Sequence, residues 1–152
     1  MTTSRFFYIT YIRTTAQRLW DALTLPEHTE VYWGCRQESD WRPGAGWKMF
    51  LPDGRLGDSG KVVEIDPPRR LVLEWRNEFL PDLTAEGPSR CVIELEPMGE
   101  TVRLSVLHEI DREGSKLIEA VSSGWPMILS SLKSLLETGH PLPAQPRPPK
   151  EA

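Results

Sequence analysis

The chain has 152 residues, of which 39% are hydrophobic and 26% charged, and its formal net charge is -4 at pH 7. This length suits one domain that buries a core without disulfides or a metal to support it. The 22 acidic against 18 basic residues argue against nucleic-acid binding, which usually needs a basic surface. The first 20 residues lack the apolar stretch of a signal peptide, and no segment suits a membrane span, so we expect a cytoplasmic protein that binds no membrane.

The N-terminal part of the chain predicts a strand and two short helices. Aromatic and β-branched residues crowd residues 5–13, which is typical of a strand. A capping box with Thr14 as N-cap predicts the first helix. A second capping box begins at Thr24 and predicts a helix from about Pro26 to Trp33, which Gly34 ends.

The middle of the chain predicts several short strands. Apolar residues alternate with polar ones over residues 71–76, 91–96 and 102–110, so each strand has one buried face. Turn signals punctuate this region at residues 43–46, 52–54, 58–60, 66–68 and 97–99. No helical pattern lies between the strands, which indicates an antiparallel sheet and excludes a parallel α/β sheet.

The C-terminal part predicts one long amphipathic helix, over about residues 113–138, that Gly139 ends. Pro126 cannot donate to the carbonyl of Ser122, so a kink or local unwinding is expected there. Before this helix, residues 79–89 form a broken, polar segment with three large apolar residues, and a loop of this length is usually functional or mobile.

These elements predict an α+β fold. A curved antiparallel sheet wraps around the long C-terminal helix, and the two short helices that follow the first strand plug one end. A curved sheet touches a single helix along a line, so a pocket remains wherever inward side chains do not fill the space. The predicted domain covers residues 1–139, and the proline-rich residues 140–152 predict a disordered or polyproline tail.

Three blocks of sequence carry a resemblance to a known family. They are residues 12–27 followed by Tyr32-Trp33-Gly34, residues 60–71 followed by Trp75, and residues 124–139. In this order and spacing, over roughly residues 6–139, the chain resembles START-like (SRPBCC) domains of the type called activator of heat-shock protein 90 ATPase homologue. The resemblance implies the helix-grip fold, shared with plant pollen-allergen and lipid-transfer domains, and a cavity for a small, largely apolar ligand.

Aromatic residues supply most candidates for such a cavity. Trp75 and His108 have inward parity on their strands, and Trp125 lies beside the interruption of the long helix. The candidate ligand-binding residues are Tyr8, Trp33, Trp47, Trp75, His108, Trp125 and Leu129. For each tryptophan, packing in the core is the alternative, and for His108 the alternative is a core histidine with satisfied hydrogen bonds.

No motif points to catalysis, a metal or a cofactor. Cys35 and Cys91 fit neither a disulfide framework nor a zinc site, and the three histidines are scattered. No serine lies in a nucleophile elbow, and no glycine spacing suits a phosphate loop. We therefore expect no catalytic residue, no metal and no cofactor.

Three functions stay open at this point. The first is binding of a small hydrophobic ligand, with no catalysis. The second is a co-chaperone-like module that regulates an ATPase, which would make a chaperone its partner. The third is an enzyme of the polyketide cyclase or hydrolase kind, which occurs in the same superfamily. A homodimer also stays open.

Overall fold

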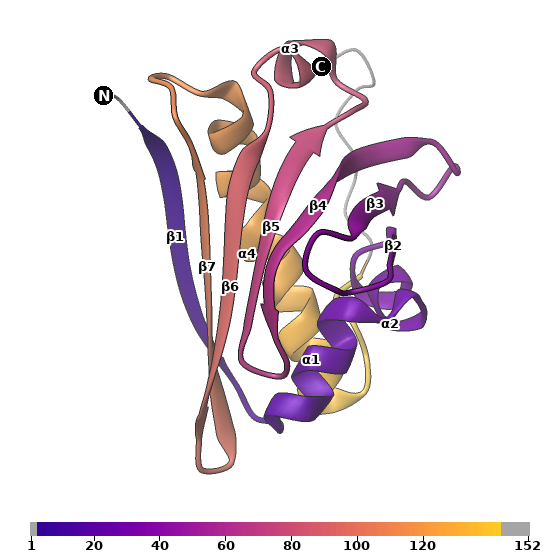
Figure 1. Cartoon of the computed structure of the whole chain (residues 1–152). Helices are drawn as coiled ribbons and strands as arrows, with labels where there is room; N and C mark the ends of the chain where they lie inside the picture. The colour runs from indigo at the N-terminus through magenta and orange to yellow at the C-terminus, as the bar shows by residue number, and fades with distance from the viewer. Residues whose placement is uncertain (1–2, 144–152) are drawn as a thin grey trace.

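The computed structural model of the chain describes residues 3–143, and these form one antiparallel sheet and four helices (Figure 1). The strands are β1 (Ser4–Ile12), β2 (Arg36–Ser39), β3 (Gly46–Phe50), β4 (Leu56–Asp66), β5 (Arg70–Asn77), β6 (Ser89–Met98) and β7 (Thr101–Ile110). The helices are α1 (Ala16–Thr24), α2 (Pro26–Tyr32), α3 (Pro81–Thr84) and α4 (Lys116–Thr138).

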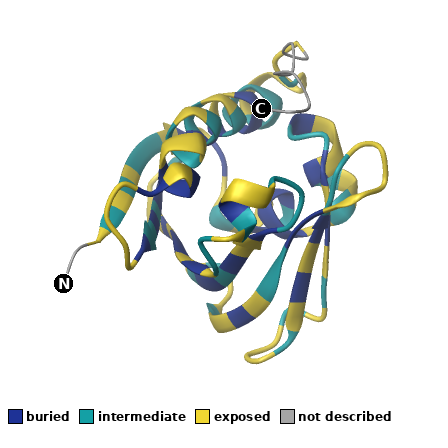
Figure 2. Ribbon diagram, turned by 90° about the horizontal axis from the view of Figure 1, so that it is seen from above, coloured by how far each residue is buried: buried dark blue, intermediate teal, exposed yellow. Residues whose placement is uncertain are grey.

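The sheet has the strand order β1-β7-β6-β5-β4-β3-β2, with every neighbouring pair antiparallel. It curves around α4, which lies along its inner side, while α1 and α2 lie at one end and α3 at the other (Figure 1). Seen from above, buried residues alternate with exposed ones along the strands (Figure 2). This arrangement confirms the predicted helix-grip fold.

The predicted alternation of the central strands is confirmed, and it places the core between the sheet and α4. Leu73, Cys91 and His108 lie side by side in the register of β5, β6 and β7, and all three are buried. Val72 and Val92, on the opposite face of the same strands, are buried as well, which alternation alone does not predict.

The two predicted helix caps are wrong by one residue. Thr15, not Thr14, is the N-cap of α1, because its backbone is extended and its hydroxyl accepts a hydrogen bond from the N–H of Arg18 at 3.1 Å. The buried hydroxyl of Thr14 has no hydrogen-bond partner within residues 3–143. Thr24 is the last residue of α1, where its hydroxyl donates to the carbonyl of Trp20, and Leu25 takes the N-cap position of α2.

The predicted turn at residues 58–60 is also wrong, because these residues lie inside β4. Gly60 pairs with Trp47 on β3 and with Trp75 on β5. A Cβ atom at Gly60 would lie 1.7 Å from the carbonyl oxygen of Glu74, so the close approach of β5 requires a glycine. Gly60 therefore permits the close contact between β4 and β5, and its neighbours on the adjacent strands are two tryptophans.

Helix α4 begins and ends close to its predicted limits. Ser115 is its N-cap and accepts a hydrogen bond from the N–H of Ile118 at 3.1 Å. Gly139 ends it in the left-handed conformation, with φ of 87°. The helix continues through Pro126. Most of the predicted tail, residues 144–152, lies outside the described residues.

We predict that Gly60→Ala lowers the free energy of unfolding by roughly 3 kcal/mol or more, because the added methyl group overlaps the backbone of β5. Urea unfolding followed by circular dichroism measures this change. Gly46→Ala, on β3, is the matched control, because a Cβ atom there meets nothing within 4 Å. Equal unfolding midpoints for the two variants would contradict the close strand approach.

Candidate functional site

A pocket of about 180 Å³ lies between the sheet and the first half of α4, with α3 beside it. Its lining residues are Trp33, Asp58, Trp75, Asn77, Phe79, Leu80, Leu83, Leu117, Ala120, Val121, Gly124, Trp125 and Ile128. Apart from Asp58, Asn77 and Gly124, these side chains are apolar, which is the usual character of a small-molecule site.

The segment between β5 and β6 forms one wall of the pocket. Asn77, at the end of β5, accepts hydrogen bonds on Oδ1 from the N–H groups of Phe79 and Leu80, at 3.1 and 2.9 Å. These bonds turn the chain into the short helix α3, which buries Leu83 beside the start of α4. The three large apolar residues of this segment, Phe79, Leu80 and Leu83, all line the pocket.

Glu86 ties this wall to α4. Its carboxylate accepts hydrogen bonds from the hydroxyl of Ser115 at 2.6 Å and from the N–H of Lys116 at 2.7 Å. Burial raises the pKa of Glu86, but these bonds and that from the N–H of Leu117 outweigh it, and the pKa lies below its ordinary value. A carboxylate at a helix N-terminus also stabilises the helix dipole.

Five of the seven candidate residues come together as an aromatic cluster, made of Trp33, Trp47, Trp75, His108 and Trp125. Trp75 is its centre, with ring centroids 4.6 Å from Trp47, 5.2 Å from His108, 5.7 Å from Trp125 and 6.3 Å from Trp33. The members come from β3, β5, β7, α4 and the residue after α2. Trp33, Trp75 and Trp125 line the pocket.

The four remaining candidates, Tyr8, Trp47, His108 and Leu129, do not line the pocket. Trp47 and His108 are fully buried behind it. Leu129 is fully buried in the core, and Tyr8 on β1 stacks on Phe6, with ring centroids 6.1 Å apart.

His108 is held by hydrogen bonds on both ring nitrogens. The indole N–H of Trp125 can only donate, so Nδ1 of His108 accepts it, at 3.2 Å. Ser89 donates its hydroxyl hydrogen to the carbonyl of Trp75, so it accepts a hydrogen bond from Nε2 of His108, at 2.8 Å. Burial lowers the pKa of His108 to about 4. The imidazole is therefore neutral at physiological pH, with its hydrogen on Nε2.

Asp58, on β4, is the ionisable side chain in the lining of the pocket. It is 7% exposed, and its Oδ1 accepts a hydrogen bond from the indole N–H of Trp75 at 3.0 Å. Burial raises its pKa to about 7, the hydrogen bond from Trp75 opposes this, and the nearby Glu78 raises it further. Asp58 therefore titrates near neutral pH.

Sequence reasoning missed Asp58 because it read residues 58–60 as a turn. The only signal for Phe79, Leu80 and Leu83 was the presence of large apolar residues in an otherwise polar segment. The pocket-lining residues of α4 belong to the predicted apolar stripe, but a stripe does not separate core contacts from pocket contacts.

No nucleophile comes with this pocket among the described residues. Cys91 pairs with His108 in the register of β6 and β7, but burial raises the pKa of its thiol, and both ring nitrogens of His108 are engaged. Within residues 3–143, no group of three or more His, Cys, Asp or Glu could hold a metal ion. None of the described helices is long and apolar enough to cross a membrane.

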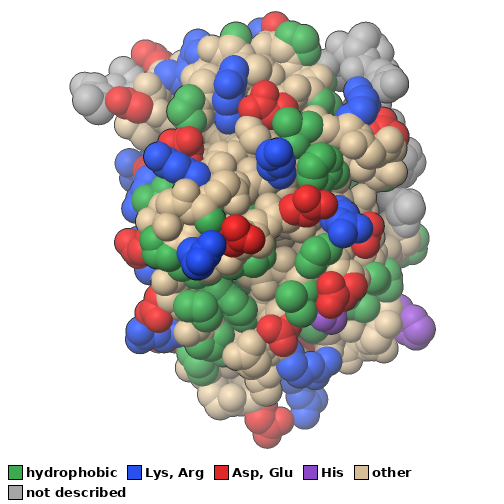
Figure 3. All heavy atoms as spheres, turned by 45° about the vertical axis from the view of Figure 1, so that its right-hand side comes forward, with side chains coloured by type: hydrophobic (Ala, Val, Ile, Leu, Met, Phe, Trp, Pro, Cys, Tyr) green, Lys and Arg blue, Asp and Glu red, His purple; other side chains and the backbone are tan. Residues whose placement is uncertain are grey.

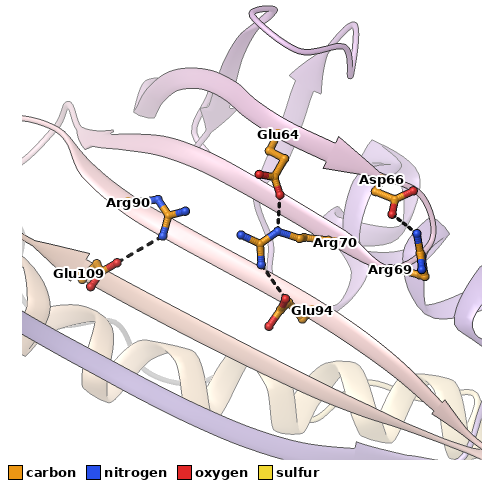
Figure 4. Close-up of polar contacts among 7 residues, drawn as sticks. All are labelled: Glu64, Asp66, Arg69, Arg70, Arg90, Glu94 and Glu109. Atoms are coloured by element: carbon orange, nitrogen blue, oxygen red, sulfur yellow. Dashed lines mark hydrogen bonds and ion pairs between the residues drawn. The ribbon is translucent and has the colours of Figure 1, made fainter.

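A second depression, of about 360 Å³, lies on the outer face of the sheet. Its charged side chains are Asp66, Arg69, Arg70, Glu94, Glu96 and Arg103. Arg70 pairs with both Glu64 and Glu94, and Arg69 with Asp66 (Figure 4). These charges neutralise one another in solvent, where ion pairs contribute little. Acidic and basic side chains are also interspersed on the face of the molecule shown in Figure 3. Neither this face nor the depression on the sheet suits a strongly charged ligand.

We predict that Asp58→Asn stabilises the protein at pH 8 and changes its stability little at pH 4. Because folding raises the pKa of Asp58, the folded state holds this proton more tightly, and the resulting stability is lost as pH rises through 7. The gain at pH 8 is a few kcal/mol, since each pKa unit corresponds to about 1.4 kcal/mol.

Thermal unfolding at both pH values measures this effect. Glu74→Gln removes the same charge from the outer face of the neighbouring strand β5 and is the control. If Asp58→Asn raises the stability equally at both pH values, the raised pKa of Asp58 is contradicted.

Comparison with solved structures supports the fold. The solution structure of the Aha1 dimer from Colwellia psychrerythraea matches with a TM-score of 0.73 and 18% identity, over 90% of this chain and 98% of that one. Protein MLL2253 from Mesorhizobium loti matches with a TM-score of 0.76 and 19% identity, over 88% and 97% of the two chains. CalU16 from Micromonospora echinospora matches with a TM-score of 0.71 and 24% identity, over 91% and 77%.

No curated protein matches the chain. The family model described as "Activator of Hsp90 ATPase homolog 1-like protein" matches residues 13–137, which is most of the chain and includes β2 to β7 and all but the last residue of α4. With the helix-grip fold and these structural neighbours, the match confirms the resemblance seen in the sequence. The chain belongs to the family of Activator of Hsp90 ATPase homolog 1-like proteins.

Proposed function

We propose that the chain binds a small, largely apolar ligand in the pocket between the sheet and α4, without catalysing a reaction. The observation that carries this proposal is the pocket itself, where the side chains of three tryptophans, α3 and α4 leave an apolar space of about 180 Å³. A space of this kind binds apolar molecules because they displace poorly bound water.

The volume of the pocket limits the ligand. An engineered protein cavity of about 150 Å³ holds one benzene molecule. The present pocket, at about 180 Å³, therefore accommodates a single aromatic ring, or an aliphatic group of similar size, with a short substituent. Larger ligands would extend beyond this space, because the pocket is partly open to solvent.

The absence of catalysis rests on the ionisable groups at this site. General acid–base catalysis that removes a proton from one atom of a substrate and delivers one to another commonly uses an acid and a base that both reach the substrate. His108 lies behind the lining and uses both ring nitrogens within the core. Among residues 3–143, Asp58 is the one ionisable residue in the lining, so the described part of the chain places no acid–base pair in this pocket.

Gly124 provides a test of this proposal. It lines the pocket from α4, and a Cβ atom there would meet only Ile128, at 4.0 Å. We predict that Gly124→Leu fills the pocket and abolishes ligand binding. Gly124→Ala, at the same position, preserves binding, and both variants gain helix stability because glycine is a poor helix former.

Thermal-shift measurements with toluene and ethylbenzene check this prediction. A ligand present at 100 times its dissociation constant stabilises the folded state by about 2.7 kcal/mol, which raises Tm by roughly 5–10 °C in a chain of this size. We expect this rise in the unmodified protein and in Gly124→Ala, and none in Gly124→Leu. The proposal fails if no rise occurs, or if Gly124→Leu responds equally. Stimulation of a chaperone ATPase without any ligand effect would favour the co-chaperone alternative.

A further inference from the structure

We propose that the ligand of this pocket carries a protonated amine on its apolar body, and that Asp58 is the counter-ion of this amine. The proposal rests on the proposed function and specifies the chemical class of the ligand. It stands on three observations: a buried carboxylate in the pocket lining with one hydrogen bond, a described lining without a cationic residue, and tryptophan rings in the same lining.

Asp58 lines the pocket with a carboxylate that forms a single hydrogen bond among the described residues. Its side chain is more than nine-tenths buried, and it lines the pocket together with Trp75 and Asn77. Oδ1 accepts the indole N–H of Trp75, and this is the hydrogen bond that the carboxylate forms within residues 3–143. A carboxylate can accept several hydrogen bonds, so Asp58 retains capacity for a donor that enters the pocket.

The negative charge of Asp58 lacks a positive partner in the pocket lining. The lining contains no Lys, Arg or His, and the residues of α3 and α4 that face the space are uncharged. Glu78, whose charge acts on Asp58, is also acidic and raises the pKa of Asp58. Buried charges in proteins are normally paired, so a cation from outside would complete this site.

The walls of the pocket suit an ammonium group as well. Trp33, Trp75 and Trp125 line part of the space, and the rings of Trp33 and Trp125 pack together with centroids 5.5 Å apart. The faces of indole rings attract cations, and they do so more strongly where water is excluded. An amine beside Asp58 would thus gain a charge-assisted hydrogen bond and cation–π contact, while its apolar part occupies the space beside α4.

Other ligand charges fit this site less well. An anionic ligand would face Asp58 and Glu78, two carboxylates with no compensating cation in the lining. A neutral apolar ligand would cover Asp58 and remove its remaining solvent without supplying a donor, which destabilises the carboxylate.

Benzylamine and ethylbenzene test the proposal, because they have the same number of non-hydrogen atoms and differ in the ammonium group. Isothermal titration calorimetry at pH 8 measures both dissociation constants. We expect benzylamine to bind roughly tenfold or more tightly than ethylbenzene to the unmodified protein. Glu74→Gln, with its change on the outer face, retains this preference. Asp58→Asn loses it, because asparagine keeps an acceptor for Trp75 but carries no charge.

The pH dependence of the preference gives an independent measurement. Lowering the pH from 8 to 5.5 protonates Asp58, whose pKa is about 7, and should reduce the preference several-fold in the unmodified protein but not in Asp58→Asn. His108, the histidine of the aromatic cluster, stays neutral over this range because burial lowers its pKa to about 4.

Each outcome separates this proposal from the proposed function. If ethylbenzene and benzylamine bind equally, or if benzoate binds as well as benzylamine, the amine proposal is overturned while ligand binding stands. If Asp58→Asn keeps the full preference, Asp58 is not the counter-ion. If none of the three compounds binds, the proposed function fails, and this proposal fails with it.

Discussion

The indole of Trp75 lies where the sheet, α4 and the residue after α2 meet. It contributes an apolar ring to the core and an N–H group that needs a hydrogen-bond acceptor. Its ring packs against those of Trp47, Trp125 and Trp33 in the core. Its N–H must find an acceptor, as buried indoles generally do, and that acceptor is Asp58. A single side chain thereby brings a carboxyl group to the edge of an apolar pocket.

A carboxyl group in this position destabilises the folded chain. Desolvation disfavours the charged form, one hydrogen bond from Trp75 offsets part of that cost, and Glu78 adds to it. Since a domain of this kind is stable by only about 5–15 kcal/mol, a loss of a few kcal/mol is a large share. Strained electrostatics of this sort are typical of sites that act on a partner rather than of the hydrophobic core.

Much of the fold could be predicted from the sequence, because alternation over residues 71–76, 91–96 and 102–110 and the long stripe of α4 each report a single buried face. Alternation also predicts that Trp75 points inward, whereas Trp33 and Trp125 were candidates as aromatic residues, Trp125 also for its place beside the interruption of the long helix. Asp58 was not, because polar and glycine residues in a row resemble a turn, whereas here they run through a strand. The glycine is needed for contact with the next strand, and only the three-dimensional register shows this.

The hydrogen bond between Trp125 and His108 also governs how α4 sits on the sheet. Apolar side chains hold α4 against the strands, but such contacts have little directional preference and would allow the helix to rotate about its long axis. A donor on the helix that reaches an acceptor on β7, in turn anchored through Ser89 to β5, selects one rotational setting. The rotation of the helix decides which of its residues face the pocket. The shape of the binding space therefore depends on the imidazole of His108, which lies outside the pocket lining.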